Sequence, residues 1–108
     1  LYLAAQNGHV DVIKALIVAG AAVDAKLDDG WTPLHSAAEK GHEVAIKVLI
    51  EAGAAVDAKF DDGTTPLHWA AYNGHVGAIE TLIAAGAAVG AKSNDVGRRY
   101  ILPQKMAT

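Results

Sequence analysis

Residues 30–62 read GWTPLHSAAEKGHEVAIKVLIEAGAAVDAKFDD, and residues 63–95 read GTTPLHWAAYNGHVGAIETLIAAGAAVGAKSND. The two stretches are identical at 21 of 33 positions. Residues 1–29 align with residues 34–62 at the same shift of 33 and match at 19 of 29 positions. Internal repetition at a fixed period of this length indicates an architecture in which similar units stack in a line.

Each unit opens with the signals of a short helix. In residues 30–62, Thr32 is a good N-cap, and Pro33 is tolerated at the first helical position because its missing N–H has no intrahelical partner there. The sequence predicts a helix over residues 34–40, in which apolar residues recur at i, i+3 and i+4. Gly41 ends this helix, since glycine readily adopts the left-handed conformation of a C-cap.

A second helix follows in each unit. In residues 30–62 it is predicted over about residues 43–52, with an apolar stripe at Ile46, Leu49 and Ile50. Isolated helices shorter than about 12–15 residues are marginal in water, so their stability must come from packing. The alanine pair in each first helix permits close approach of the neighbouring helix. The prediction is therefore a linear stack of helix pairs with no single central core.

The repeat register defines the domain organisation. We expect one array over residues 1–108, with a truncated unit at 1–29, full units at 30–62 and 63–95, and a degenerate capping segment or tail at 96–108. The chain starts at the equivalent of Leu34 and lacks an initiator methionine, so Leu1 is not expected to be the natural beginning of the polypeptide. We expect the apolar stacking face of the truncated unit to allow self-association.

Composition excludes several classes of protein. The 108 residues carry a formal net charge of -3, which argues against a dedicated nucleic-acid binder. There is no cysteine, so disulfides, thiolate catalysis and thiolate metal sites are excluded. No apolar run approaches the length of a membrane span, and residues 1–5 carry neither the basic region nor the cleavage site of a signal peptide. We therefore expect no membrane association and a cytoplasmic or other intracellular location.

The motif at the start of each full unit resembles the ankyrin repeat. It reads Thr-Pro-Leu-His-Ser-Ala at residues 32–37 and Thr-Pro-Leu-His-Trp-Ala at residues 65–70, against the family signature Thr-Pro-Leu-His-x-Ala with a period of 33. The resemblance implies an all-α helical repeat solenoid, with two antiparallel helices and a β-hairpin-like finger in each repeat. It also implies protein–protein binding through the fingers and the inner, first-helix face.

The histidines favour a structural interpretation. The five histidines occupy two repeat positions. The first set follows a glycine and consists of His9, His42 and His75. The second set ends the Thr-Pro-Leu-His motif and consists of His35 and His68. Ligands spread along a stack do not converge on one site, so we expect no metal, no cofactor and no catalytic residue. The resemblance implies that the second set bonds near the first-helix start, often with the threonine hydroxyl. It implies that the first set bonds to the loop backbone of a neighbouring unit.

Residues at the ends of the first helices and along the finger edge define a candidate partner-binding surface. Helix phase and the resemblance place one group on the concave side, namely Gln6, Asn7, Glu39, Lys40, Tyr72 and Asn73. A second group lines the adjoining finger edge, namely Asp28, Asp29, Trp31, Asp61, Asp62 and Thr64.

Two interpretations of these residues are open. The aspartate pairs are either solvated turn formers or an acidic edge that meets a basic partner. Trp31 and Tyr72 are either interface anchors or local packing residues, whereas Trp69 and Phe60 favour packing.

The function that these observations favour is noncatalytic. We interpret the chain as a protein–protein interaction module whose partner is a protein, expected to be basic. The alternative is an architectural or regulatory solenoid segment of a larger enzyme or effector protein.

Overall fold

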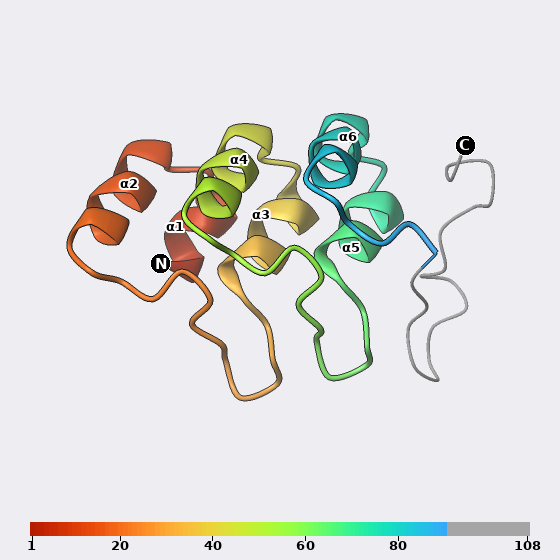
Figure 1. Ribbon diagram of the computed structural model, residues 1–108, viewed down its shortest axis with the longest axis horizontal. Coiled ribbons are helices and arrows are strands. Elements are labelled where there is room, and N and C mark those ends of the chain that lie inside the picture. Colours follow the sequence, from red (N-terminus) through yellow and green to blue (C-terminus); the bar gives the residue numbers. More distant parts are fainter. Residues whose placement is uncertain (91–108) are drawn as a thin grey trace.

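The computed structural model describes residues 1–90, which form three helix pairs stacked in a line (Figure 1). The helices are α1 (Tyr2–Asn7), α2 (Val10–Val18), α3 (Pro33–Lys40), α4 (Glu43–Glu51), α5 (Pro66–Tyr72) and α6 (Val76–Ala84). The helices predicted over residues 34–40 and 43–52 are confirmed as α3 and α4, each with one boundary shifted by one residue. The segment at 96–108, expected to be a cap or tail, lies outside the described residues.

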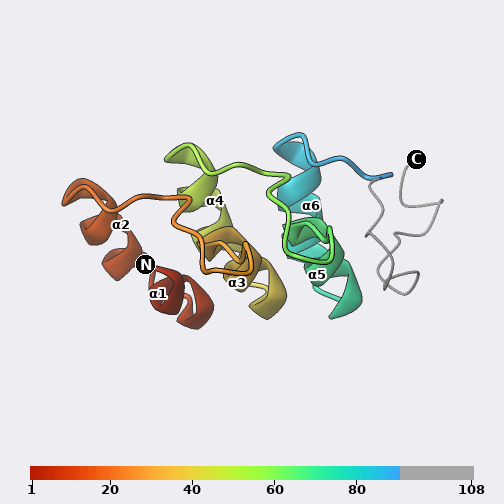
Figure 2. The ribbon, with the colours of Figure 1, turned by 90° about the horizontal axis from the view of Figure 1, so that it is seen from below.

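The helices are arranged in two rows. In the first row α1 packs against α3 and α3 against α5, and in the second α2 packs against α4 and α4 against α6. Figure 2 shows the two rows lying side by side along the length of the molecule. Each helix therefore contacts its counterpart in the next pair, which gives a short helix the packing partners that it lacks alone.

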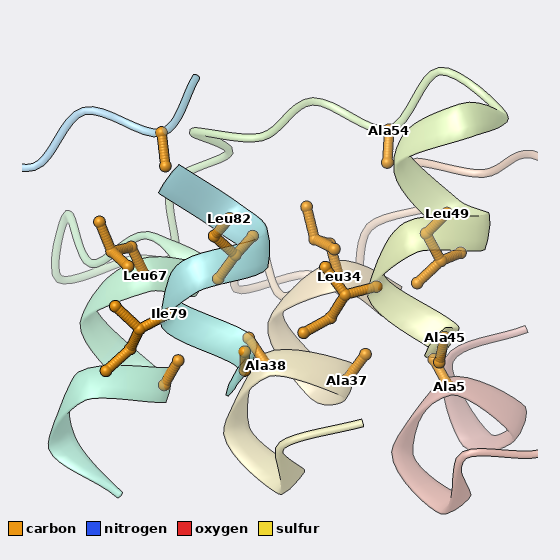
Figure 3. Packing of buried hydrophobic residues seen from close by; sticks show 14 of the residues in the cluster. Ala5, Leu34, Ala37, Ala38, Ala45, Leu49, Ala54, Leu67, Ile79 and Leu82 are labelled. Carbon is orange, nitrogen blue, oxygen red and sulfur yellow. The ribbon is translucent and has the colours of Figure 1, made fainter. Parts of the chain in front are cut away.

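The core is a strip of aliphatic side chains between the two rows (Figure 3). Leu34 and Leu67 come from the first row, Leu49 and Leu82 come from the second, and all four are fully buried. The small side chain of Ala37, also fully buried, adds no bulk between neighbouring helices. The prediction of a linear stack without a central core is confirmed by this arrangement.

A reciprocal pair of hydrogen bonds fixes the start of α3. The Thr32 hydroxyl oxygen accepts a hydrogen bond from the backbone N–H of His35 at 3.3 Å, while the Thr32 N–H donates to His35 Nδ1 at 3.1 Å. Pro33 occupies the first turn, as predicted. The same pattern opens α5, where the Thr65 N–H donates to His68 Nδ1 at 2.9 Å.

The loops that join the helix pairs project below the helices as fingers (Figure 1). In the first finger the Leu27 N–H donates to the Trp31 carbonyl at 3.0 Å, and in the second the Phe60 N–H donates to the Thr64 carbonyl at 2.9 Å. Residues 1–90 contain helices and no β-strand. The all-α class is thus confirmed, but the β-hairpin-like character of the fingers is not. None of the helices in this part of the chain has the length and apolar character that a membrane crossing requires.

Candidate protein-interaction surface

Histidines of one unit fix the first-helix end of the unit before it. His42 Nε2 donates a hydrogen bond to the Gln6 carbonyl at 3.0 Å, and His75 Nε2 donates to the Glu39 carbonyl at 2.9 Å. The His42 ring lies over Gly8, where an ideal Cβ would be only 2.7 Å from the ring Nδ1. A bond to the backbone of the neighbouring unit, as the resemblance implied, is thus confirmed for His42 and His75, but each acceptor carbonyl lies in the last turn of a helix and not in a loop. These contacts place the ends of α1, α3 and α5 side by side.

The six residues predicted on the concave side are at these helix ends. Asn7, Lys40, Tyr72 and Asn73 are exposed, and Gln6 and Glu39 are half-buried. The Asn73 side-chain nitrogen donates to the Glu39 carbonyl at 3.2 Å, which joins the end of α5 to the end of α3. The structure therefore brings the first predicted group together along one row of helix ends.

Two of the finger carboxylates form turns. Asp29 Oδ1 accepts a hydrogen bond from the Trp31 N–H at 3.1 Å. Asp62 Oδ1 accepts from the Thr64 N–H at 3.0 Å and from the Thr64 hydroxyl at 2.6 Å. An aspartate side chain that bonds to the backbone two residues later is a common turn former. The turn-forming interpretation is thus confirmed for Asp29 and Asp62.

Thr64 is not part of the exposed finger edge, which corrects its place in the predicted surface. Its side chain is fully buried because the Trp69 indole covers it, and Trp69 Nε1 donates to the Thr64 hydroxyl at 2.8 Å. A partner cannot reach this hydroxyl without displacing the indole. Asp28 and Asp61 remain as the exposed acidic positions of the finger group.

Trp31 packs against aromatic rings from α3, from the second finger and from α5. Its ring stacks on His35 with centroids 4.9 Å apart and meets Phe60 and Trp69 edge-on at 5.0 and 5.1 Å. Trp69 in turn contacts the Tyr72 ring at 6.3 Å. Packing is thus the role that the structure gives Trp31, and the packing predicted for Phe60 and Trp69 is confirmed. The rings form an aromatic strip that leads from the fingers to the exposed end of α5.

The two indoles make equivalent hydrogen bonds from exchanged positions. Trp31 Nε1 donates to the Ser36 hydroxyl at 2.7 Å, and Trp69 Nε1 donates to the Thr64 hydroxyl at 2.8 Å. Each bond spans five residues, with tryptophan first in one repeat and second in the next. The exchange of a large and a small residue between repeats is visible in the sequence, although sequence reasoning did not predict the hydrogen bonds.

One apolar residue that sequence reasoning did not select also belongs to this side of the molecule. Leu3 occupies the repeat position of Ser36 and Trp69 and is 58% exposed. The signal that identifies it is the same repeat alignment, because a leucine stands where the other repeats have a hydroxyl or an indole. Leu3 extends the apolar part of the surface to α1.

Two grooves lie along the row of second helices. Grooves of about 420 and 340 Å³ run between α4 and α6 and between α2 and α4, with Glu51 on the wall of both. None of the twelve predicted partner-binding residues lines either groove. Within residues 1–90 no three histidine or carboxylate side chains are grouped so that they could hold a metal ion.

His35 is a buried neutral imidazole. Its Nδ1 accepts the Thr32 N–H, so the proton lies on Nε2, which donates to the Thr64 carbonyl at 3.2 Å. Burial lowers the pKa of His35 from 6.5 to about 4, although the hydrogen bond to Thr64 and the charges of Asp62 and Asp29 act in the opposite direction.

We expect the stability of the fold to fall between pH 7 and pH 4.5. In this range the unfolded chain binds a proton at His35 that the folded chain does not, since the pKa rises from about 4 to 6.5 on unfolding. The contribution of neutral His35 to the free energy of unfolding is fully present above pH 6.5. It is lost as the pH falls toward 4, and the loss amounts to about 3 kcal/mol. Urea unfolding at several pH values measures the slope. His35→Gln should reduce this slope, and an equal slope in that variant would contradict the assignment.

Comparisons with known proteins agree with the repeat pattern. A family model described as "Ankyrin repeats (3 copies)" matches residues 1–93. The chain is also similar to protein phosphatase 1 regulatory subunit 12A of Mus musculus and of Rattus norvegicus, with 53% identity to each over 36 residues. That similarity covers 33% of this chain and 4% of the curated relatives, so it spans only a small part of their length.

Proposed function

Because the chain belongs to the ankyrin repeat family, we propose that residues 1–90 form a noncatalytic module that binds a protein partner through its first-helix face and fingers. Ankyrin repeats are generally protein-interaction modules, and the family is typically noncatalytic. One observation carries the proposal for this chain. An aromatic strip within the fold ends at Tyr72, a residue that is 52% exposed beside the aligned helix ends.

The proposed binding surface consists of the exposed or half-exposed residues on this side. They are Leu3, Gln6, Asn7, Leu27, Asp28, Glu39, Lys40, Asp61, Tyr72 and Asn73. Trp31, Asp29 and Asp62, which are half-buried, fix the fingers through the packing and turn bonds described above. A surface whose supporting side chains are already ordered loses little conformational entropy on binding, which favours affinity.

The charge of the module indicates the chemistry of its partner. Residues 1–90 carry eleven aspartates and glutamates against five lysines. The acidic surplus includes Asp28 and Asp61 on the fingers, next to exposed apolar groups such as Leu27. A partner that presents an apolar patch flanked by lysine or arginine complements this surface. Such charges accelerate association more than they raise affinity, and salt weakens their effect.

Truncation of Tyr72 tests the proposed surface. We expect Tyr72→Ala to weaken partner binding by about 2 kcal/mol or more, because exposed aromatic residues at the centre of an interface are frequent hot spots. The fold should remain intact, since Tyr72 is already half exposed to solvent. Proteins retained by the immobilised chain would be identified by mass spectrometry, and the affinity of a purified one would then be measured by calorimetry.

Glu51→Ala provides the matched control. Glu51 is exposed at the end of α4, in the row of helices that does not carry the proposed surface. This variant should bind as tightly as the unmodified chain. Weaker binding by Glu51→Ala together with unchanged binding by Tyr72→Ala would place the interface on the opposite side of the molecule.

A second function has one observation in its favour. The curated relatives are named as a regulatory subunit, and the similarity covers only 4% of their length. The repeats of this chain would then be a regulatory segment of a larger protein, and binding through the same surface would serve to position another part of that protein. Catalytic motifs elsewhere in the full-length gene would favour this second function.

A further inference from the structure

Residues 1–90 contain two asparagines, Asn7 and Asn73, and a glycine follows each of them. This dipeptide is prone to deamidation, because glycine has no side chain to shield its backbone nitrogen. The glycine nitrogen attacks the asparagine Cγ, ammonia leaves, and a five-membered succinimide forms. Water then opens the ring at one of its two carbonyl carbons and gives aspartate or isoaspartate. Because the two dipeptides are identical, any difference in rate comes from their surroundings.

We propose that Asn73 is a site of spontaneous deamidation in the folded protein and that Asn7 is protected. Asn7 is the last residue of α1, and Gly8 is the C-cap of that helix. In contrast, α5 already ends at Tyr72, and Asn73 is its C-cap, with φ -93° and ψ 4°. A residue outside the helix has fewer backbone constraints to lose before its side chain reaches the next nitrogen.

Packing from the next unit covers Gly8, whereas none of residues 1–90 covers Gly74. The His42 ring stands 2.7 Å from the ideal Cβ position of Gly8, and His42 Nε2 donates to the Gln6 carbonyl at 3.0 Å. No atom of the described chain lies within 4 Å of the corresponding position at Gly74. The N–H groups of Gly8 and Gly74 donate to helix carbonyls at 3.2 and 3.1 Å, so the attack requires local opening at both sites. That opening must displace the His42 ring at the first site and no described side chain at the second.

Hydrogen bonds of the side-chain amides would slow deamidation more at Asn73 than at Asn7, but their effect is smaller than that of backbone opening. Asn73 Nδ2 donates to the carbonyls of Glu39 and Trp69, both at 3.2 Å, whereas Asn7 Nδ2 donates only to the Leu3 carbonyl at 3.0 Å. All three bonds are exposed, and water competes with them. The ease of backbone opening therefore determines which asparagine reacts first.

Deamidation at this position changes both charge and geometry. The product carries a carboxylate at the end of α5, where the negative end of the helix dipole disfavours it. The Nδ2 donor that bonds to Glu39 is lost, and isoaspartate adds one carbon to the backbone between α5 and α6. Because Asn73 lies on the proposed binding surface, the product is also expected to alter partner binding. This last consequence rests on the proposed function, whereas the reaction itself does not.

The test measures deamidation of the intact 108-residue chain. The chain is kept at physiological temperature and pH for several weeks, and the conversion of amide to acid is located by peptide mass spectrometry. We expect Asn73 to react at least about fivefold faster than Asn7, as follows from easier local opening. His42→Ala uncovers Gly8 and should accelerate the reaction of Asn7.

His75→Ala is the matched control for lost stability. It removes the equivalent ring over Gly41, which no asparagine precedes, so the rate at Asn7 should stay unchanged. Three results would overturn the proposal: an equal or higher rate at Asn7 in the unmodified chain, no reaction at Asn73, or equal acceleration of Asn7 by the two histidine variants. None of these measurements requires a partner, so failure here is distinct from failure of the proposed function.

Discussion

Replacement of Leu49 by alanine should lower the free energy of unfolding by about 2–5 kcal/mol, which is the usual cost of emptying a fully buried leucine site. Leu49 lies in α4, the helix that packs against both α2 and α6, and its side chain has no exposed area (Figure 3). Small domains are stable by only about 5–15 kcal/mol, so this loss is a large part of the total. Urea unfolding followed by circular dichroism measures it.

Val44→Ala on the same helix is the control for this variant. Val44 is 57% exposed, so its truncation should change the free energy of unfolding by no more than about 0.5 kcal/mol. Equal unfolding midpoints for Leu49→Ala and the unmodified chain would contradict the packing of α4 between its two neighbours.

Trp31→Ala should destabilise the fold by about 3 kcal/mol, a value typical of the loss of a large packed aromatic side chain. The substitution removes ring contacts to His35, Phe60 and Trp69 and leaves the Ser36 hydroxyl without the indole donor. These partners belong to α3, the second finger and α5, so the indole connects consecutive repeats. Urea midpoints of this variant and the unmodified chain test the expectation.

The stability of Trp31→Ala should be compared with that of Tyr72→Ala. Its half-exposed ring contacts the strip at one end, through Trp69, so we expect a much smaller loss of stability. Normal stability of Trp31→Ala together with lost partner binding would assign Trp31 to the interface and contradict its structural role.

Much of the fold could be predicted because its signals are local and repeated. The start of α3 follows from Thr32 and Pro33, whose capping and fixed φ act within one helical turn. The end of α5 is less predictable, since it stops at Tyr72 although the repeat alignment places its end one residue later, as in α3. Helix ends depend on weak hydrogen bonds that the surroundings can shift by a residue.

The candidate surface was predictable where repeat position alone decides exposure. The helix ends at Asn7, Lys40 and Asn73 lie together because the stack repeats them in register. The predicted exposure of Thr64 was wrong, because its burial depends on an indole that lies five residues further along the chain. Trp31 and Trp69 occupy different repeat positions, and only the three-dimensional arrangement shows that their rings meet.

The most direct test of the binding surface is to map it with a partner bound. Backbone amide chemical shifts of the isotope-labelled chain would be followed by NMR during titration with a protein that the immobilised chain retains. We expect the largest changes at the ends of α1, α3 and α5, including Lys40, Tyr72 and Asn73, and at the finger residues Asp28 and Asp61. Changes confined to α2, α4 and α6, for example around Glu51, would contradict this expectation.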